Sequence, residues 1–224
     1  MNAFAASLAV ITGRGASGSP AFQLDHPVLY GTAFSIAPDL FVTAAHVIRA
    51  AQDEGKVALA RLTPGDFQIL EVLQAEMFEN VDLALLHCPH LNAERLPLQM
   101  EPLDFLTEVF SLGYPFGLEL DTKTIQLRAF KGHVVSRRTL THLSAEPAGY
   151  ELSFTPPAGL SGSPLLALSH GLPRIAGVVL GSRSIEYRES RLEVGIALDV
   201  ATLQELQSRI LRTILPSGFS NFRT

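Results

Sequence analysis

The hydrophobic positions of this chain come in short runs, and each run ends at a glycine, a proline or a polar cluster. β-Branched and aromatic residues recur in these runs, which is typical of strands. About a dozen strands at spacings of roughly 8 to 15 residues predict an all-β protein made of barrels or sandwiches. The predicted strands are residues 7–13, 31–36, 40–47, 56–62, 67–76, 82–88, 108–114, 125–136, 150–154, 164–168, 175–181 and 192–199.

Helical spacing is found in two places. The stretch "AAHVIRAAQ" predicts a short helix that follows His46. Near the C-terminus, apolar residues recur at helical spacing after Asp199, a predicted N-cap, and Pro216 ends the pattern. This second pattern predicts one long helix, and its apolar members are Leu203, Leu206, Ile210, Leu211, Ile214 and Leu215.

A segment with two prolines and little periodicity, residues 90–104, separates two groups of predicted strands. It predicts a crossover between two barrels. We therefore expect an N-terminal β-barrel over residues 1–100, a C-terminal β-barrel and helix over 101–215, and a tail over 216–224.

The composition excludes several classes of function. A chain of 224 residues with 47% hydrophobic content can bury a sizeable core. The net charge of −5 argues against nucleic acid as a partner. No run approaches the roughly 20 apolar residues of a membrane span, so no membrane association is expected. The apolar N-terminus lacks the positive flank of a signal peptide, and Cys88 is the single cysteine, so we expect a cytoplasmic protein without an intrachain disulfide.

The stretch "PPAGLSGSPLL", residues 156–166, places glycines on both sides of Ser161 and then enters an apolar run. A serine hydroxyl is a weak nucleophile that needs a base, and an attacked carbonyl needs hydrogen-bond donors fixed in advance. Gly159 can adopt a φ that turns its N–H inward beside that of Ser161. The stretch therefore predicts either a nucleophile with an oxyanion hole or an ordinary glycine-rich turn before a strand.

Candidate partners for Ser161 lie earlier in the chain. His46 ends the β-rich run "LFVTAAHV", where two alanines allow close packing around the imidazole. Asp82 opens the apolar strand "DLALLHC", where a charge is costly unless it is paired, although an Asx turn at the strand entry also explains it. The word "HCPH" at 87–90 lacks a second ligand pair, so we expect no metal there.

Taken together, the motifs "GTAFSIAPDLFVTAAHV", "NVDLALL" and "GLSGSP" resemble the sequences around the catalytic residues of the trypsin/chymotrypsin-like serine proteases, and they occur in the same order. The words "SLGYPFG", "KGHVVS" and "VGIALDVATLQEL" are most similar to HtrA-type and related bacterial trypsin-like peptidases. The likeness covers roughly residues 5–215 and does not include the peptide-binding C-terminal domain of HtrA-type enzymes.

This resemblance implies an all-β fold of two six-stranded antiparallel barrels of the chymotrypsin type with a C-terminal α-helix. It implies a serine endopeptidase that acts on polypeptide substrates with no metal or cofactor. In that reading Ser161 is the nucleophile, His46 the base and Asp82 the carboxylate that orients it, while the N–H groups of Gly159 and Ser161 form the oxyanion hole.

The sequence departs from the family pattern at Leu160, where HtrA-type enzymes usually carry asparagine. This departure leaves open an inactive or latent protease-fold module that binds peptide or a partner, or an enzyme that an activating or regulatory protein orders. The resemblance assigns the substrate pocket to Thr155, Gly181, Ser182 and Gly195, which suits a small or medium apolar side chain. The charged segment 181–193 is predicted as a solvated hairpin tip or, alternatively, as a contact loop for substrate or partner.

Overall fold

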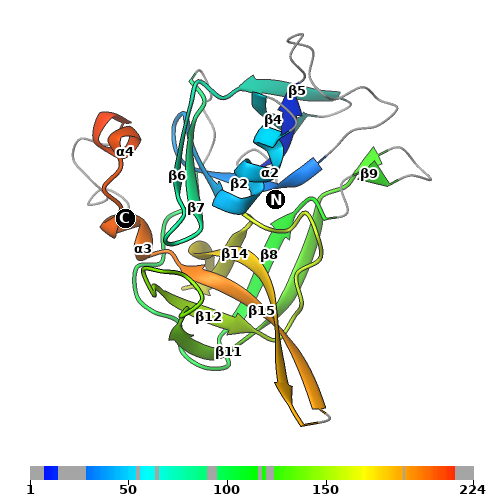
Figure 1. Ribbon diagram of the computed structural model, residues 1–224, viewed down its shortest axis with the longest axis vertical. Coiled ribbons are helices and arrows are strands. Elements are labelled where there is room, and N and C mark those ends of the chain that lie inside the picture. Colours follow the sequence, from blue (N-terminus) through cyan, green and yellow to red (C-terminus); the bar gives the residue numbers. More distant parts are fainter. Residues whose placement is uncertain are drawn as a thin grey trace.

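The computed structural model describes residues 8–14, 29–53, 56–63, 66–89, 95–115, 118–119, 124–188 and 190–214. Within these ranges the chain forms two antiparallel β structures packed against each other, with short helices at the edges (Figure 1). The predicted all-β, chymotrypsin-like double β-barrel fold is confirmed. The tail over 216–224, including Pro216, lies outside the described residues.

The first half is a seven-stranded sheet with the order β5-β4-β1-β2-β3-β7-β6, one strand more than the six expected. Its only helix among the described residues, α2 (Ala45–Asp53), follows β3 directly and confirms the predicted helix at His46. The strands are β1 (Leu8–Arg14), β2 (Leu29–Ala37), β3 (Leu40–Ala44), β4 (Lys56–Thr63), β5 (Asp66–Glu71), β6 (Gln74–Phe78) and β7 (Leu83–His87).

The second half is a closed barrel of six strands in the order β11-β12-β15-β14-β13-β8, as expected. A small hairpin, β9 (Leu118–Glu119) with β10 (Thr124–Ile125), stands outside it. The barrel strands are β8 (Glu108–Gly113), β11 (Arg128–Thr139), β12 (Ala148–Leu152), β13 (Pro164–Ser169), β14 (Leu172–Tyr187) and β15 (Ser190–Asp199).

Burial follows the position of each strand. Every residue of β3 is buried, because β3 lies between β2 and β7 and is covered by α2. In β11 the burial alternates over most of its length, because one face of this strand points to solvent. Strand β3, which leads directly into the start of α2, is thus packed on both of its faces.

The single long helix predicted after Asp199 is wrong in detail. The structure has two short helices, α3 (Thr202–Glu205) and α4 (Arg209–Ile214), and the backbone at Leu206 is extended. Asp199 does not cap a long helix: its carboxylate accepts hydrogen bonds from the Tyr150 hydroxyl, at 2.6 Å, and from the Ala201 N–H, at 2.9 Å.

A contact with the first half explains the interruption. The Ser208 hydroxyl donates to the Glu76 carboxylate on β6 at 2.7 Å and also accepts the Leu211 N–H at 3.0 Å. The same carboxylate accepts from the Arg209 and Ile210 N–H groups. Helix α4 therefore starts where Glu76 satisfies its first free N–H groups, rather than continuing from α3. Neither of these helices nor α2 has the length or apolar character required to cross a bilayer, within the part of the chain that the structure describes.

Candidate active site

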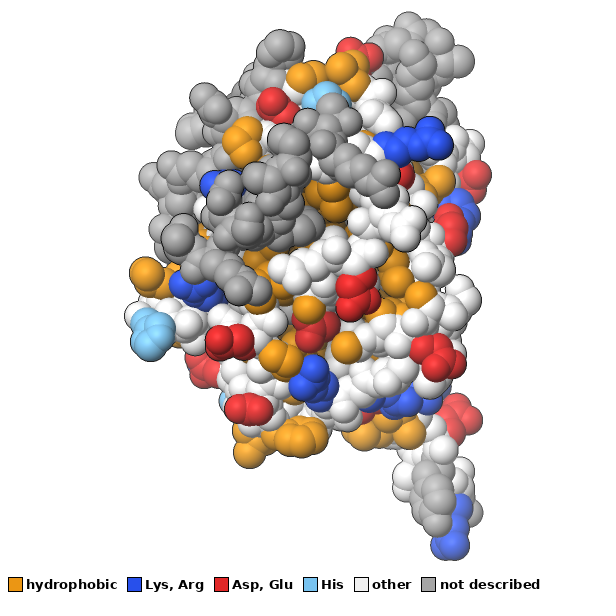
Figure 2. All heavy atoms as spheres, turned by 90° about the vertical axis from the view of Figure 1, so that its left-hand side faces the viewer, with side chains coloured by type: hydrophobic (Ala, Val, Ile, Leu, Met, Phe, Trp, Pro, Cys, Tyr) orange, Lys and Arg blue, Asp and Glu red, His pale blue; other side chains and the backbone are white. Residues whose placement is uncertain are grey.

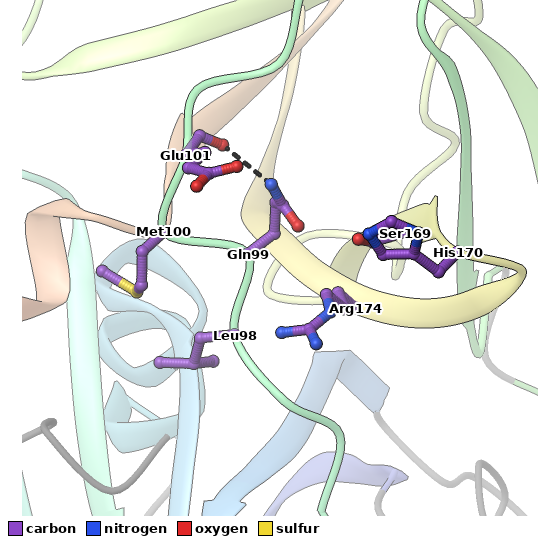
Figure 3. A pocket seen from close by; sticks show the side chains of 7 residues that line it. All are labelled: Leu98, Gln99, Met100, Glu101, Ser169, His170 and Arg174. Carbon is purple, nitrogen blue, oxygen red and sulfur yellow. Dashed lines mark hydrogen bonds between the residues drawn. The ribbon is translucent and has the colours of Figure 1, made fainter. Parts of the chain in front are cut away.

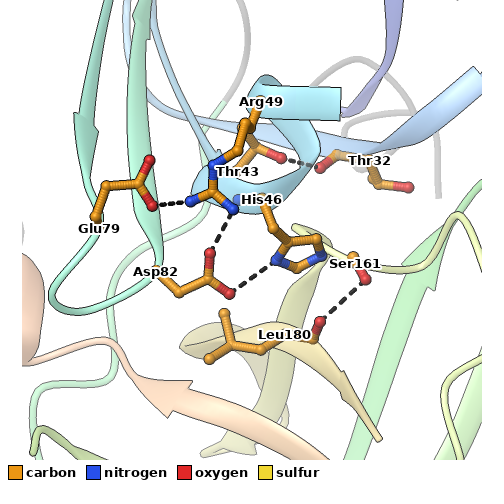
Figure 4. A network of polar contacts seen from close by, with 8 residues as sticks. All are labelled: Thr32, Thr43, His46, Arg49, Glu79, Asp82, Ser161 and Leu180. Atoms are coloured by element: carbon orange, nitrogen blue, oxygen red, sulfur yellow. Dashed lines mark hydrogen bonds and ion pairs between the residues drawn. The ribbon is translucent and has the colours of Figure 1, made fainter. Parts of the chain in front are cut away.

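His46 and Asp82 meet at the edge of the first half (Figure 4). His46 is the second residue of α2, and its Nδ1 lies 2.8 Å from Asp82 Oδ2. The other carboxylate oxygen accepts the backbone N–H of His46 at 2.9 Å, and the Asp82 carbonyl accepts the Ala45 N–H at 3.2 Å. The side chain of Asp82 is 18% exposed and that of His46 is 40% exposed, so the imidazole reaches solvent while the carboxylate is shielded.

The local backbone explains why Asp82 points at His46. Asp82 ends the turn that leads into β7 and adopts a left-handed conformation, with φ of 54°. Aspartate tolerates this region better than most residues. Ala44 at the end of β3 pairs with Leu83 at the start of β7, so the turn lies beside the first turn of α2. The carboxylate accepts the His46 N–H in the first turn of this helix, as an N-cap side chain does.

Ser161 follows a tight turn in the second half. The Leu160 N–H donates to the Pro157 carbonyl at 3.1 Å, and Gly159 between them has φ of 88°. This hydrogen bond and a positive φ at the third residue are the signature of a type II turn, which favours glycine there. Within the described part of the chain, the N–H groups of Gly159 and Ser161 donate to no acceptor. Two neighbouring donors are thus available beside the hydroxyl.

Thr32 on β2 joins this turn to the first half. Its N–H donates to the Ser161 carbonyl and its hydroxyl donates to the Gly159 carbonyl, both at 2.9 Å. The hydroxyl also accepts the Tyr114 N–H at 3.1 Å. Nothing in the sequence singles out Thr32, except that it is a hydroxyl residue in the apolar run "GTAFSI".

Gly162 permits the close approach of the two halves at this point. It has φ of 82°, and a Cβ placed there would lie 2.1 Å from Thr43 Oγ1 and 2.3 Å from the Thr32 carbonyl oxygen. No side chain fits in that space. The turn is therefore pressed against β2 and β3, and Ser161 comes to lie beside the His46 ring (Figure 4).

The hydroxyl of Ser161 is oriented toward β14. Its Oγ donates to the Leu180 carbonyl at 3.0 Å, and among the described residues it makes no hydrogen bond to His46. The structure thus brings together all three residues that the sequence singled out, with the histidine–carboxylate bond formed and the serine–histidine bond not formed.

Leu160 packs inward. Its side chain is fully buried, and a Cβ placed at Gly113 would lie 2.8 Å from Leu160 Cδ1. The side chain therefore rests on the β8 backbone and anchors the turn that carries Gly159 and Ser161. At the position where HtrA-type enzymes usually carry asparagine, this chain therefore has a packed core residue.

The four predicted pocket residues lie in different surroundings. A cavity of about 330 Å³ is lined by Ser182 together with Thr141, His142, Arg183 and Ile196. Thr155, Gly181 and Gly195 do not line it. Thr155 is exposed, Gly181 borders open space, and Gly195 packs against the Phe154 carbonyl and the Pro156 ring.

A cavity of about 450 Å³ lies elsewhere, between residues 98–101 and the β13–β14 hairpin (Figure 3). It is lined by Leu98, Gln99, Met100, Glu101, Ser169, His170 and Arg174. Its lining mixes acidic and basic side chains and includes none of the predicted site residues, so it is separate from the Ser161 site.

The described residues contain no cluster of metal-ligating side chains. In the word "HCPH", His90 lies outside the described residues and Cys88 is buried. Burial, with a smaller contribution from the nearby Asp39 charge, raises the pKa of the Cys88 thiol to about 12. This cysteine is therefore protonated at neutral pH and is a poor ligand and nucleophile.

The chain is similar to known serine proteases in sequence. The family profile described as "Trypsin-like peptidase domain" matches residues 31–172, which include His46, Asp82 and Ser161. Serine protease Rv3671c of Mycobacterium tuberculosis is 29% identical over 160 residues, which are 69% of this chain and 36% of the relative. The chain thus spans about a third of the length of this curated relative.

Solved structures share the fold. The active form of the M. tuberculosis Rv3671c protease superimposes with a TM-score of 0.68 at 24% identity, covering 96% of this chain and 83% of that chain. The HtrA-type protease AlgW with a tripeptide superimposes with a TM-score of 0.66 at 17% identity, covering 97% of this chain and 63% of that chain.

Proposed function

The chain belongs to the trypsin-like serine protease family, and from this premise we propose that it hydrolyses peptide bonds with Ser161, His46 and Asp82 as a catalytic triad. The observation that carries the proposal is the His46 Nδ1–Asp82 Oδ2 hydrogen bond of 2.8 Å on the side of the imidazole away from Ser161. It leaves Nε2, the other ring nitrogen, free to take the serine proton.

In the proposed reaction, Ser161 Oγ attacks the carbonyl carbon of the scissile bond and His46 Nε2 accepts the hydroxyl proton. The C–N bond then breaks, and His46 passes the proton to the departing amine. A water molecule hydrolyses the acyl-enzyme by the same steps. Asp82 holds the Nδ1–H tautomer and stabilises the imidazolium, a role that suits a carboxylate already bonded to the His46 backbone.

The N–H groups of Gly159 and Ser161 are the proposed oxyanion hole. Both are free of protein acceptors within the described part of the chain, and the type II turn holds Gly159 in place. Donors that are already oriented stabilise the developing negative charge without reorganisation.

Ser161 has to rotate for catalysis, because its Oγ is bonded to the Leu180 carbonyl. Rotation about one χ1 angle exchanges staggered wells at small cost, and serine–histidine bonds commonly tighten only when substrate binds. We assign this rotation to the approach of the substrate.

Labelling with a fluorophosphonate serine-hydrolase probe tests the proposal directly. The parent is expected to be labelled, and Ser161→Ala and His46→Ala to lose labelling, while all three proteins melt at similar temperatures. A parent that is folded but unlabelled at any pH between 5 and 9 contradicts an assembled nucleophile and base.

A second candidate is a latent or non-catalytic module that binds peptide or a partner protein. The orientation of Ser161 toward Leu180 favours it, since the nucleophile is not bonded to its base in this state. Peptide binding that is equal in the parent and in Ser161→Ala, with no cleavage by the parent, supports this candidate. Labelling that appears only after addition of another protein supports an enzyme that needs an activator.

Two further proposals concern the side chain that the substrate pocket accepts and the cellular location of the protein. We propose that a small or medium apolar substrate side chain binds near Thr155, Gly181, Ser182 and Gly195, since none of them carries a charge, although they do not line one shared cavity in this structure. We propose a cytoplasmic location, since the buried Cys88 thiol is stable in a reducing compartment. A peptide library read by mass spectrometry tests the first, and fractionation of the source cells tests the second.

A further inference from the structure

The β14–β15 hairpin extends beyond the second barrel as a two-stranded arm (Figure 1). Within the barrel, β14 pairs with β13 as far as Val178, and β12 pairs with β15 only from Gly195 to Leu198. From Ser182 to Tyr187, and back from Ser190 to Val194, the two strands pair with each other alone among the described strands. We define these residues as the arm; it stands out at the lower right of Figure 2.

One edge of the arm runs directly into the site. This edge is the side of β14 that faces away from β15. The Leu180 carbonyl points outward from it, because it accepts the hydrogen bond from Ser161 Oγ at 3.0 Å. Beyond the irregularity between Val179 and Gly181, the pairing of β14 with β15 continues residue by residue to Tyr187. The free edge of β14 is therefore a continuous extension of the surface beside the nucleophile.

Alternate residues of this edge offer unpaired backbone groups. In an antiparallel pair, the N–H and C=O of successive residues point alternately to the partner strand and away from it. Counting in twos from Leu180 places Ser182, Ser184 and Glu186 on the free edge. All three are exposed, and none has a further hydrogen bond within the described residues.

An edge of this kind can accept a further strand. Isolated two-stranded hairpins are marginally stable, and an unpaired edge is a template for an added strand. The arm also exposes an apolar position: Leu192 is 58% exposed and pairs with the partly buried Ile185. Both features are more consistent with an interaction surface than with a solvated hairpin tip.

We propose that the arm binds the substrate as an added antiparallel strand and reads residues far to the N-terminal side of the scissile bond. This inference rests on the proposed function, because Ser161 defines the register. The residue whose carbonyl is attacked lies opposite Leu180. Counting back from the scissile bond, the third, fifth and seventh residues then lie opposite Ser182, Ser184 and Glu186.

The side chains of the arm add a preference. Residues directly opposite each other across an antiparallel pair point to the same face. The sixth substrate residue therefore lies beside Ile185, on the face that Leu192 shares. An apolar side chain at this position packs against the partly buried Ile185, so the arm favours extended substrates with an apolar sixth residue.

Backbone-modified peptides test the register. A denatured casein digest by the parent identifies a cleaved sequence, which is synthesised with four or seven residues before the scissile bond. We expect kcat/KM to rise about 10-fold or more with the longer peptide. N-methylation of the fifth or seventh residue should lower kcat/KM about 3- to 10-fold by removing a hydrogen bond. N-methylation of the sixth residue, whose N–H points away, is the matched control.

A variant tests the apolar preference. Ile185→Thr keeps a β-branched residue and should remove the preference for an apolar sixth residue. Its hydrolysis of the four-residue peptide should match that of the parent, since Ile185 is outside the catalytic machinery. Binding of overlapping casein decapeptides to Ser161→Ala measures the contribution of the arm without any cleavage. N-methylation of the fifth or seventh residue should weaken this binding, and N-methylation of the sixth should not.

The outcomes separate this proposal from the proposed function. Equal cleavage of short and long peptides overturns the arm proposal and keeps the protease. Ser161→Ala that binds long peptides in the expected pattern, with a parent that cleaves nothing, keeps the arm and overturns the protease. Three further results overturn the arm proposal. One is that N-methyl effects are confined to the C-terminal side of the scissile bond. The others are no binding of long peptides at all, and an arm-dependent dimer in sedimentation.

Discussion

The His46–Asp82 pair and the Ser161 turn are held in different ways. The pair belongs entirely to the first half, where the Asp82 carboxylate and carbonyl accept one imidazole and two backbone N–H groups at the start of α2. The Ser161 turn belongs to the second half and is pressed against the first through Thr32.

This difference shows where the site is robust. The proposed base and its carboxylate are positioned by hydrogen bonds within the first half of the molecule. The proposed nucleophile and oxyanion hole are correctly placed only when the two halves dock. Changes at the pair should therefore affect the chemistry, and changes around the turn should affect the assembly of the site.

The largest effect is expected from Asp82→Asn. The amide oxygen can still accept the His46 N–H, but the amide NH₂ facing Nδ1 favours the wrong imidazole tautomer. We expect kcat to fall about 10⁴-fold with little change in melting temperature. Peptide hydrolysis and thermal denaturation measure the two quantities. A tenfold loss or less contradicts a catalytic role for this hydrogen bond.

The next effect is expected from Leu160→Ala, which removes the buried anchor of the Ser161 turn. A cavity from such a truncation costs about 2 to 5 kcal/mol of unfolding free energy, measured by urea denaturation. We also expect kcat to fall under conditions where the protein stays folded. Leu152→Ala is the matched control, because Leu152 is equally buried but lies in the barrel core. Equal kcat in both variants contradicts a positioning role for Leu160.

A smaller effect is expected from Thr32→Val, which removes the hydrogen bonds to the Gly159 carbonyl and from the Tyr114 N–H. We expect a loss of about 2 kcal/mol in the free energy of unfolding and a roughly tenfold lower kcat/KM. Ser35→Ala is the control, since it deletes a buried hydrogen bond to Ala37 within the first half. If both variants retain full activity, the contact through Thr32 does not position the turn.

The smallest effect is expected from Glu76→Gln, at a second contact between the halves. Burial raises the pKa of Glu76, but hydrogen bonds from Ser208 and the α4 backbone lower it more, so it lies below its ordinary value. A lowered folded-state pKa stabilises the protein above the ordinary glutamate pKa of about 4.3, and the stabilisation is lost as the pH falls through the folded value. The variant should be less stable by about 1 kcal/mol at neutral pH.

Thermal denaturation of parent and Glu76→Gln at several pH values measures this contribution. The difference between the two proteins should be full at neutral pH and should vanish in acid, where Glu76 is protonated in the parent as well. A difference that does not change with pH indicates that the charge of Glu76 contributes nothing to the docking of α4.

Several features were predictable because they depend on local patterns. The alternation and length of the apolar runs predict strands, the word "AAHVIRAAQ" predicts helix α2, and the glycines around Ser161 predict a tight turn. Ser161 stands out because glycines flank it, and His46 because two alanines precede it. Asp82 stands out because a charge beside a buried strand requires a partner. These signals are encoded within about ten residues each.

Other features depend on contacts between residues far apart in the chain, and the sequence alone does not show them. Thr32 binds Gly159 across 127 positions, and Glu76 binds Ser208 across 132, so neither contact leaves a local pattern. The second contact divides the predicted long helix, because a carboxylate that satisfies free N–H groups can start a new helix where apolar spacing alone predicts continuity. The sequence by itself determined the strands and the three candidate catalytic side chains. The tertiary structure alone decided how the two halves dock, which way the Ser161 hydroxyl points and how far the β14 edge extends, because these follow from long-range packing.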